Sequence, residues 1–369
     1  MPRPARQQPI ANSPQLASAW KRSFRTKLLA WYANHARDLP WRNNRDPYRV
    51  WLSEVMLQQT TVAAVKPYYE RFTAAFPTVE ALANADEADV LRLWEGLGYY
   101  RRARGLHAAA KQIVAEHNSQ VPRDVPTLLT LPGIGRYTAG AIVSIAFDQR
   151  APILEANTIR VFTRLTAYRG EPVKSAGQKF LWGVAEEVLP ERDIARFNQA
   201  LMELGSLVCT PTAPKCSTCP VNKLCEARRA GAVDELAATT KKLKFESVQE
   251  AAVIVRKGNK ILVRQCGPTE RWSGLWDFPR FECDSAKQIA VKLTAQTGVT
   301  AELGEVLTSF KYGVTRFRIS LDCYTATHKS GRLAGPHLVW RTVEEIAALP
   351  LSVTGRRIVK LLEKKVERE

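Results

Sequence analysis

The sequence predicts a multidomain protein, in which an all-α domain over residues 20–225 is followed by a small α+β domain over residues 247–369. Residues 20–147 and 157–207 have helical spacing, with prolines at element starts. Four of the seven cysteines lie within residues 209–225. After residue 246, short β-branched runs bounded by Gly and Asn replace the helical pattern. A length of 369 residues is sufficient for two or three domains.

The composition is that of a globular protein with a strong positive charge. Lys and Arg number 54 and Asp and Glu 36, so the formal net charge is 54 − 36 = +18. Such an excess favours a polyanionic partner, with nucleic acid first, although solubility alone sometimes produces it. The longest apolar run, residues 139–147, is half of what a membrane span needs, and the N-terminus lacks a secretory signal pattern. We expect a monomeric cytoplasmic protein, associated with the nucleoid in a bacterium.

The individual elements follow from local patterns. Residues 1–19, rich in Pro, Gln, Ala and Ser, are expected to be a flexible lead. Asp46 and Pro47 predict a helix start, as N-cap and first helical residue. The polar, basic residues 226–246 predict a linker. Strands are expected at residues 251–255, 261–263 and 317–321, and a helix at 287–296.

A glycine-containing turn is expected between a short helix at residues 127–130 and an apolar helix at 137–147. In the string Leu-Pro-Gly-Ile-Gly-Arg, Gly133 and Gly135 let the backbone turn with its N–H groups outward at a helix N-terminus, which suits an anion. Two glycines alone are typical of any helix–helix corner. The full string resembles a helix-hairpin-helix, which implies sequence-independent binding of a DNA phosphate.

The cysteine cluster predicts a metal centre. Cys209, Cys216, Cys219 and Cys225 have the spacing C-x6-C-x2-C-x5-C, with no histidine nearby. A structural zinc is the simpler interpretation, but zinc sites usually contain two C-x2-C pairs, and only one is present here. One 4Fe–4S cluster fits four cysteines on a short segment better, and its role is expected to be structural.

Two glutamates are candidate catalytic acids. A glutamate on a helix usually faces solvent, but Glu54 has apolar neighbours at i−4, i−3 and i+3, so burial is expected to raise its pKa and retain a proton for general-acid work. Glu155 precedes Asn157, a plausible helix N-cap, and the helix dipole is expected to keep this carboxylate ionised. One protonated and one charged carboxyl group suit the cleavage of a glycosidic bond. The alternative is that Glu155 only caps a helix.

Together these motifs resemble the adenine DNA glycosylase (MutY) family, a branch of the endonuclease III-like helix-hairpin-helix glycosylases. The resemblance covers residues 24–225 continuously and extends more weakly to about residue 347. It is carried by the hairpin, the four cysteines and four further strings. These strings are Leu39-Pro-Trp-Arg, Trp51-Leu-Ser-Glu-Val-Met-Leu-Gln-Gln-Thr, Gly96-Leu-Gly-Tyr-Tyr and Phe197-Asn-Gln-Ala-Leu-Met-Glu-Leu-Gly.

The resemblance implies that adenine opposite 8-oxoguanine or guanine is flipped out of double-stranded DNA and hydrolysed from its sugar during base excision repair. Glu54 would protonate the base, and Glu155 would stabilise or attack the sugar cation beside Asn157 and Tyr137. The resemblance further implies an adenine pocket and a set of DNA contacts. The pocket residues are Trp41, Arg42, Leu57 and Gln199, and the DNA-binding residues are Gln59, Thr60, Leu97, Tyr99, Gly133 and Gly135.

Position 137 separates two classes of enzyme within this superfamily. The members that also cleave the strand have a lysine there, which forms a Schiff base. This chain has Tyr137 and no lysine between Lys111 and Lys174, so a monofunctional hydrolase is expected. A related lyase and a lesion-binding protein without catalysis remain the alternatives, the second because Glu155-Ala156 stands where the family has aspartate and glycine.

The last domain resembles the MutT-like (Nudix) module that recognises 8-oxoguanine in this family. Lys292, Ala295 and Gln296 stand where Nudix hydrolases have metal-binding acids, so binding without hydrolysis is expected. The lesion-contact loop corresponds to residues 314–316, in which Thr315 and Arg316 are the candidate contacts.

Overall fold

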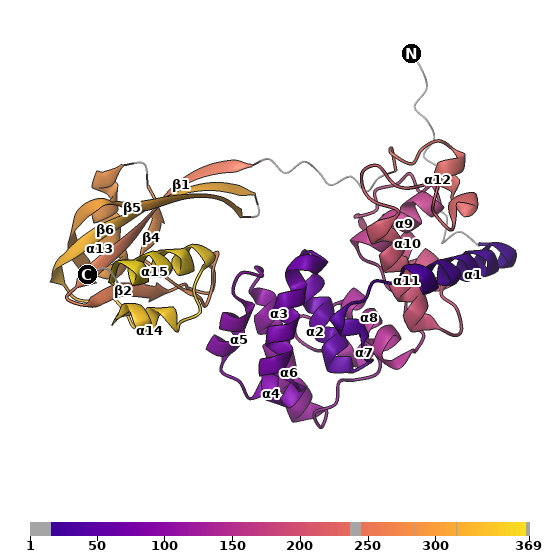
Figure 1. Cartoon of the computed structure of the whole chain (residues 1–369), viewed down its shortest axis with the longest axis horizontal. Helices are drawn as coiled ribbons and strands as arrows, with labels where there is room; N and C mark the ends of the chain where they lie inside the picture. The colour runs from indigo at the N-terminus through magenta and orange to yellow at the C-terminus, as the bar shows by residue number, and fades with distance from the viewer. Residues whose placement is uncertain (1–15, 237–244, 284, 315, 367–369) are drawn as a thin grey trace, which may run out of the picture. The chain divides into compact units, whose positions relative to one another are not determined.

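The computed structural model describes residues 16–236, 245–283, 285–314 and 316–366. They divide into two compact units (Figure 1), Met1–Asn84 with Gly105–Thr240, and Ala85–Arg104 with Lys241–Glu369. The all-α and α+β characters expected of the two parts of the chain are confirmed. Residues 85–104 were expected in the helical domain. Their contacts assign them to the second unit instead. No helix in the described ranges has the length and apolar character needed to cross a membrane.

The first unit is built from helices. Their bounds are α1 Ser18–His35, η1 Pro40–Arg42, α2 Pro47–Leu57, α3 Val62–Ala75, α4 Val79–Ala83, α6 Arg101–Glu116 (which begins in the second unit), α7 Val125–Leu128, α8 Arg136–Phe147, α9 Ala156–Leu165, α10 Ser175–Val188, α11 Ile194–Leu207, η2 Asn222–Leu224 and α12 Glu226–Arg229. Asp46 caps α2 as expected, by accepting from the Arg49 amide at 2.8 Å.

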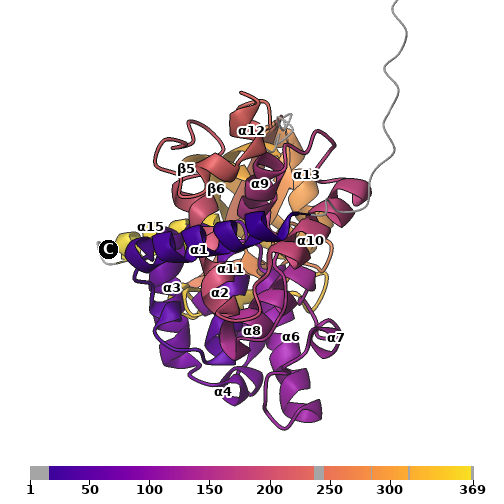
Figure 2. The ribbon, with the colours of Figure 1, turned by 90° about the vertical axis from the view of Figure 1, so that its right-hand side faces the viewer.

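Apolar clusters position the helices of this unit, and two of them lie beneath α1, α2, α8, α9 and α11. Phe24 of α1, Phe162 of α9 and Phe197 of α11 are fully buried in the larger cluster. Val50 of α2 and Ala141 of α8 belong to the second. As a result α1 packs on α11 and α2 packs on α8 (Figure 2). The N-terminus of α9 is brought near α11, since the Cβ of any larger residue at Gly205 would lie 2.6 Å from the Asn157 Cβ.

The second unit contains α5 Glu87–Trp94 and a seven-stranded sheet with three helices. The sheet elements are β1 Glu246–Lys257, β2 Lys260–Gln265, β3 Trp276–Asp277, β4 Arg280–Glu282, α13 Ala286–Thr297, β5 Val299–Val314, β6 Phe317–Gly331, β7 Leu338–Arg341, α14 Val343–Ala347 and α15 Val353–Val366. The main order is β3-β2-β1-β6-β5, with β4 paired to β1 and β7 to β2. β1 runs parallel to β6, with Glu250 opposite Leu321.

Strand β1 is buried on both faces of this sheet. Ala251, Val253 and Val255 pack in one cluster with Ile289 of α13. Ala252 and Ile254 pack in another, with residues of α14 and α15. Because successive side chains of a strand point to opposite faces, the uninterrupted apolar run of β1 places helices on both sides of the sheet.

Two expectations about local structure were wrong. The short helix before the glycine turn is Val125–Leu128 rather than 127–130, because Asp124 caps it by accepting from the Thr127 amide at 2.8 Å. Residues 226–236, expected to be part of a linker, contain α12 and bury Ala227, Ala232 and Leu236. The few apolar residues of this polar segment form a buried cluster of their own, which a flexible linker would not have. Residues 237–244 of the expected linker, and 1–15 of the expected lead, lie outside the described residues.

We predict that Gly140→Ala destabilises the helical unit. Alanine normally stabilises a helix interior by about 1 kcal/mol relative to glycine. At position 140, however, a Cβ would lie 2.3 Å from the Pro152 carbonyl oxygen, so α8 and the segment before α9 must separate. We expect a loss of about 1–3 kcal/mol, measured as a lower thermal unfolding midpoint.

Gly135→Ala is the matched control, because a Cβ there meets nothing within 4 Å and φ is −96°. Its unfolding midpoint should stay close to that of the parent protein. An unchanged midpoint for Gly140→Ala would show that the two segments are not closely packed.

Candidate active site

The helical unit contains a cavity of about 760 Å³ at the junction of α2, α8, α11 and the start of α9. Both candidate acids, Glu54 and Glu155, line this cavity. Eight other residues singled out from the sequence also line it, namely Trp41, Arg42, Leu57, Gln59, Thr60, Tyr137, Asn157 and Gln199. Residues more than a hundred positions apart in the sequence are therefore brought to one concave surface.

Glu54 lies on α2 and is only 5% exposed. Burial raises the pKa of its carboxyl group to about 7, and the neighbouring Glu155 contributes in the same direction. The Tyr137 hydroxyl donates a short hydrogen bond to Glu54 Oε2, which partly opposes the rise of the pKa. The sequence-based expectation of a buried carboxyl group with a raised pKa agrees with this geometry.

Tyr137 connects Glu54 to helix α11. Its hydroxyl oxygen also lies 3.4 Å from the Met202 sulfur. Burial, followed by the charge of Glu54, raises the pKa of Tyr137 well above its ordinary value. The hydroxyl consequently stays protonated and acts as a donor near neutral pH.

Glu155 is the N-cap of α9, and the expectation that Asn157 has this role was wrong. Glu155 Oε1 accepts from the Thr158 amide at 3.0 Å, and Oε2 accepts from the Asn157 amide at 2.9 Å and from Asn157 Nδ2 at 3.1 Å. The Thr158 hydroxyl accepts from the Glu155 amide at 2.8 Å, which completes a capping box. The longer glutamate side chain therefore reaches the same amides that shorter capping side chains use.

The pKa of Glu155 also differs from the expectation. Burial raises it, and the hydrogen bonds from Asn157 and Thr158 only partly oppose this effect. We had expected the helix N-terminus to dominate and to favour the ionised form. Desolvation is the larger influence because the carboxyl group lies inside the cavity wall and not at an exposed helix end.

Helix α9 links the cavity to the cysteine loop. Arg160 donates to Asn157 Oδ1 at 2.8 Å, and to the carbonyl oxygens of Gly205 and Cys209, both at 2.6 Å. One turn further along α9, Arg164 donates to Cys209 Sγ at 3.4 Å. Two buried arginines on one helix thus connect the side chain beside Glu155 with the first cysteine of the cluster.

The four clustered cysteines, Cys209, Cys216, Cys219 and Cys225, line one small cavity together with Arg164 and Arg228. All four are free thiols of intermediate burial. Burial raises the pKa of Cys219 to about 12 and raises that of Cys225. In the described ranges, no group of three or more His, Cys, Asp or Glu side chains is gathered closely enough for a single metal ion.

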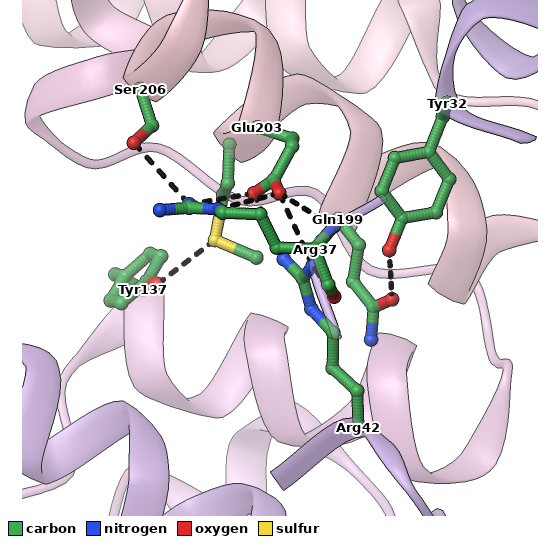
Figure 3. A network of polar contacts seen from close by, with 8 residues as sticks. Tyr32, Arg37, Arg42, Tyr137, Gln199, Glu203 and Ser206 are labelled. Carbon is green, nitrogen blue, oxygen red and sulfur yellow. Dashed lines mark hydrogen bonds and ion pairs between the residues drawn. The ribbon is translucent and has the colours of Figure 1, made fainter. Parts of the chain in front are cut away.

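A charged network beside the pocket was not predicted from the sequence (Figure 3). Glu203 of α11 is fully buried and accepts from both Arg37 and Arg42. Arg37 and Glu203 line the cavity. Charged residues on helices are usually solvent-exposed, so the only sequence signal was that Glu203 belongs to the same string as Gln199.

Two of the expected DNA contacts have unusual backbone conformations. Gln59 and Tyr99 have φ of 57° and 50°, in the left-handed region that only a few per cent of non-glycine residues adopt. Tyr99 is 42% exposed, whereas Leu97 is buried; both belong to the second unit and do not line the cavity. Strained residues often mark functional loops.

The cavity lining does not include Gly133, Gly135 or Arg316. Gly133, with φ of 75°, forms the turn between α7 and α8, and Gly135 is the N-cap of α8. Arg316 lies in the two-residue connection between β5 and β6, with its Nε 3.4 Å from Glu246 Oε1. Thr315 lies outside the described residues.

Comparison with known families gives two matches. Residues 52–187 match the model of the HhH-GPD superfamily base excision DNA repair proteins, and residues 250–361 match that of the NUDIX domain. The first includes both candidate acids and the glycine turn.

Several curated relatives named adenine DNA glycosylase are similar to this chain. The protein of Rattus norvegicus is 34% identical, over 92% of this chain and 78% of that protein. The protein of Buchnera aphidicola subsp. Schizaphis graminum is 35% identical, over 70% of this chain and 75% of that protein. The chain spans only about half, 51%, of the Mus musculus relative, with which it is 41% identical.

Solved structures resemble the helical part. A thermostable thymine-DNA glycosylase is 30% identical with a TM-score of 0.53, covering 57% of this chain and 98% of that one. An endonuclease III–DNA complex has a TM-score of 0.50 at 22% identity, covering 59% of this chain and 99% of that one, and it indicates a shared fold.

We predict that Glu54 takes up a proton near neutral pH. In a protein labelled with 13C at glutamate Cδ, one resonance should titrate with a midpoint near pH 7, since burial disfavours the charged form. This resonance should be missing from the spectrum of Glu54→Gln. The spectrum of Glu70→Gln, which removes an exposed glutamate, should retain it. A Glu54 resonance that titrates near pH 4.5 would contradict the buried environment.

Proposed function

We propose, from the premise that this chain belongs to the adenine DNA glycosylase family, that it removes adenine from double-stranded DNA by hydrolysing the N-glycosidic bond. The observation that carries this proposal is that Glu54 and Glu155 line one cavity while their carboxyl groups have different hydrogen-bond partners. Glycosidic cleavage needs two carboxyl groups with different roles. We take the cytoplasm as its location and a monomer as its working form.

The cavity is suited to a nucleobase that has left the DNA stack. The glycosidic bond and ring nitrogens of a base cannot be reached within a duplex, so enzymes acting on them rotate the nucleotide into a pocket. A volume of about 760 Å³ lies within the range of small-ligand sites. Trp41 and Leu57 supply apolar lining, and Arg42 and Gln199 supply hydrogen-bond donors.

Glu54 is assigned as the general acid. With a pKa of about 7, a large fraction of its carboxyl groups is protonated near neutral pH and able to protonate a ring nitrogen of adenine. Protonation makes the base a better leaving group. The Tyr137 hydroxyl, which donates to Glu54 Oε2, stabilises the carboxylate that remains after proton transfer.

Glu155 is assigned to the sugar. As the base leaves, positive charge develops on the sugar, and a carboxylate beside it stabilises this charge or attacks the anomeric carbon. The amides of Asn157 and Thr158 and the Asn157 side chain fix the orientation of Glu155. The rigidity of this cap supports a precise position despite the additional methylene relative to aspartate.

The residues of the cavity favour a monofunctional hydrolase over a lyase. A lyase needs an amine that forms a Schiff base with the sugar. None of the described residues that line the cavity is a lysine, and Tyr137 stands at the diagnostic position. This chain therefore has the groups for base release without strand cleavage.

Three features support DNA as the partner. The net charge is +18. The turn of Gly133 and Gly135 precedes the 12-residue helix α8, whose N-terminal amides attract an anion. Gln59, which lines the cavity, and the exposed Tyr99 have left-handed backbone conformations, which suit side chains inserted into the base stack. Thr60 follows Gln59 along the cavity rim.

The sheet domain is proposed to recognise 8-oxoguanine opposite the adenine. Of the two candidate contacts, Arg316 lies between β5 and β6, and Thr315 lies outside the described residues. Lys292 of α13 donates to the Glu282 carbonyl oxygen at 2.5 Å, in place of a metal-binding acid. This supports recognition without Nudix hydrolysis.

The four clustered cysteines fit a 4Fe–4S cluster. Their thiols line one cavity, and Arg164 and Arg228 supply positive charge beside ligands that must bind as thiolates. A four-iron cluster takes one thiolate per iron, so its ligands surround a larger centre than a single zinc ion. Such a cluster, when bound, would hold the cysteine loop together and so support the C-terminal end of α9, where Arg164 donates to Cys209 Sγ.

The decisive test uses a duplex with one adenine opposite 8-oxoguanine or guanine. We expect strand breaks only after alkali treatment, because base release leaves an intact abasic strand. Glu54→Gln and Glu155→Gln should each lower the single-turnover rate by on the order of a hundredfold or more. Glu70→Gln serves as the control, since this glutamate is exposed on α3.

Each alternative gives a different pattern. Breaks without alkali would indicate a lyase. Binding with no base release would indicate a lesion-binding protein, and a normal rate for Glu54→Gln would overturn the assignment of the acid. Equal rates opposite 8-oxoguanine and guanine would argue against lesion recognition by the sheet domain.

We also predict that Cys209→Ser lowers the content of iron and acid-labile sulfide and the visible absorbance of the purified protein, since it removes one thiolate ligand. The thermal unfolding midpoint should fall as well, because the substitution removes the sulfur that accepts from Arg164 Nη1 at 3.4 Å. Cys266→Ala, at a buried cysteine outside the cluster, is the control. Stoichiometric zinc in protein purified from cells with ample iron would contradict the iron–sulfur assignment.

A further inference from the structure

A network of charges formed by Arg37, Arg42 and the buried Glu203 adjoins the base pocket. The Glu203 carboxylate accepts from Arg37 Nε at 2.7 Å, from Arg37 Nη2 at 2.8 Å and from Arg42 Nη2 at 3.1 Å. The backbone amide of Arg37 also donates to Glu203 Oε1, at 3.1 Å. Despite the opposing effect of burial, the hydrogen bonds from the two arginines lower the pKa of Glu203. The carboxylate is thus ionised and fully paired.

The pairing fixes the guanidinium of Arg42. Besides Glu203, it donates from Nη1 to the carbonyl oxygen of Arg37 at 3.1 Å. Arg37 is itself anchored by Glu203 and by Ser206 Oγ at 3.3 Å (Figure 3). An arginine carries five N–H donors, so these contacts leave Arg42 with N–H groups for the cavity that it lines.

Tyr32 connects Gln199, the other hydrogen-bond donor of the pocket, to the same network. Its hydroxyl donates to Gln199 Oε1 at 2.7 Å, and its ring lies 5.8 Å from the Arg42 guanidinium carbon. Figure 3 shows the amide nitrogen of Gln199 turned away from the Tyr32 hydroxyl. Because the amide oxygen is already engaged, Gln199 presents its NH2 group, and not its carbonyl, to the pocket.

We propose that Tyr32, Arg37 and Glu203 are positioning residues that fix Arg42 and Gln199 as a rigid pair of hydrogen-bond donors, and that this pair makes the pocket select a base with acceptor ring nitrogens. The inference rests on the proposed function, because it names how the same pocket recognises adenine. None of the three residues is assigned a contact with the base; each acts through Arg42 or Gln199.

The chemistry of the purines explains the selection. Adenine has only acceptors among its free ring nitrogens, including N1. Guanine and hypoxanthine carry a hydrogen on N1, which would face an N–H donor and leave both groups unpaired. A site built to pair with a substrate group rejects analogues that cannot pair, since the buried polar groups then remain unsatisfied. Without the Tyr32 hydroxyl, the Gln199 amide is free to rotate and accept from N1–H.

The test compares single-turnover release of adenine and of hypoxanthine from duplexes with the same opposite base. For Tyr32→Phe we expect the adenine rate to fall while the hypoxanthine rate is unchanged or rises, so that the ratio of the two falls roughly tenfold. Arg37→Lys keeps the positive charge but removes the planar fork that pairs with Glu203, and it should lower the ratio in the same direction. Both variants leave the two acids in place.

Tyr48→Phe is the matched control. Tyr48 is another buried tyrosine of the helical unit, whose hydroxyl donates to the Phe76 carbonyl oxygen at 2.9 Å, and it does not line the cavity. This variant should keep the parental ratio at a similar thermal stability. If both rates fall equally in Tyr32→Phe and Arg37→Lys, the network is merely structural and the inference is overturned. If the parent protein releases no adenine, the proposed function itself fails.

Discussion

Burial of carboxyl groups is the constraint on which the pocket depends. Glu54, Glu155 and Glu203 lie on or beside one cavity, and each is stabilised differently. Glu54 has one hydroxyl donor and a pKa raised to about 7, Glu155 has the amides of a helix N-terminus, and Glu203 has two arginines. Because an unpaired buried charge is strongly unfavourable, these partners decide which carboxyl group retains a proton. Three glutamates in one pocket therefore differ in pKa: burial raises the pKa of Glu54 and Glu155, whereas hydrogen bonds from two arginines lower the pKa of Glu203.

Helix α9 connects the Glu155 carboxylate at its N-terminus with the cysteine loop at its other end. Its first residues orient Glu155 and Asn157, and its buried arginines, Arg160 and Arg164, reach the backbone and sulfur of Cys209. A displacement of the cysteine loop would thus move the donors that fix the Glu155 carboxylate. Since a misplacement of about 1 Å can slow a reaction roughly a hundredfold, structural support of this loop bears directly on the chemistry.

The sequence predicted the structure correctly where a local pattern is compatible with only one kind of structure. The apolar neighbours of Glu54 predicted its burial, and the short β-branched runs after residue 246 predicted a separate α+β domain. The N-cap of α9 was assigned wrongly because Asn157 is the commoner capping residue, whereas the capping box with Thr158 favoured Glu155. Arg37 and Glu203 were missed because pairing across more than 160 positions leaves no local pattern. The effect of burial on Glu155 likewise depends on tertiary packing.

The sheet domain illustrates how a fold and its chemistry can separate. Apolar residues on both faces of β1 specify a sheet covered by helices. This requirement does not depend on which side chains α13 exposes to solvent. A metal-assisted hydrolase needs several acids on that helix, and Lys292 instead donates to the backbone of Glu282. The packing surface of α13 therefore persists through Ile289 and Leu293, while its outer surface is free to change. The match of this domain to the NUDIX domain model therefore supports the fold, whereas an argument about the reaction must come from the side chains.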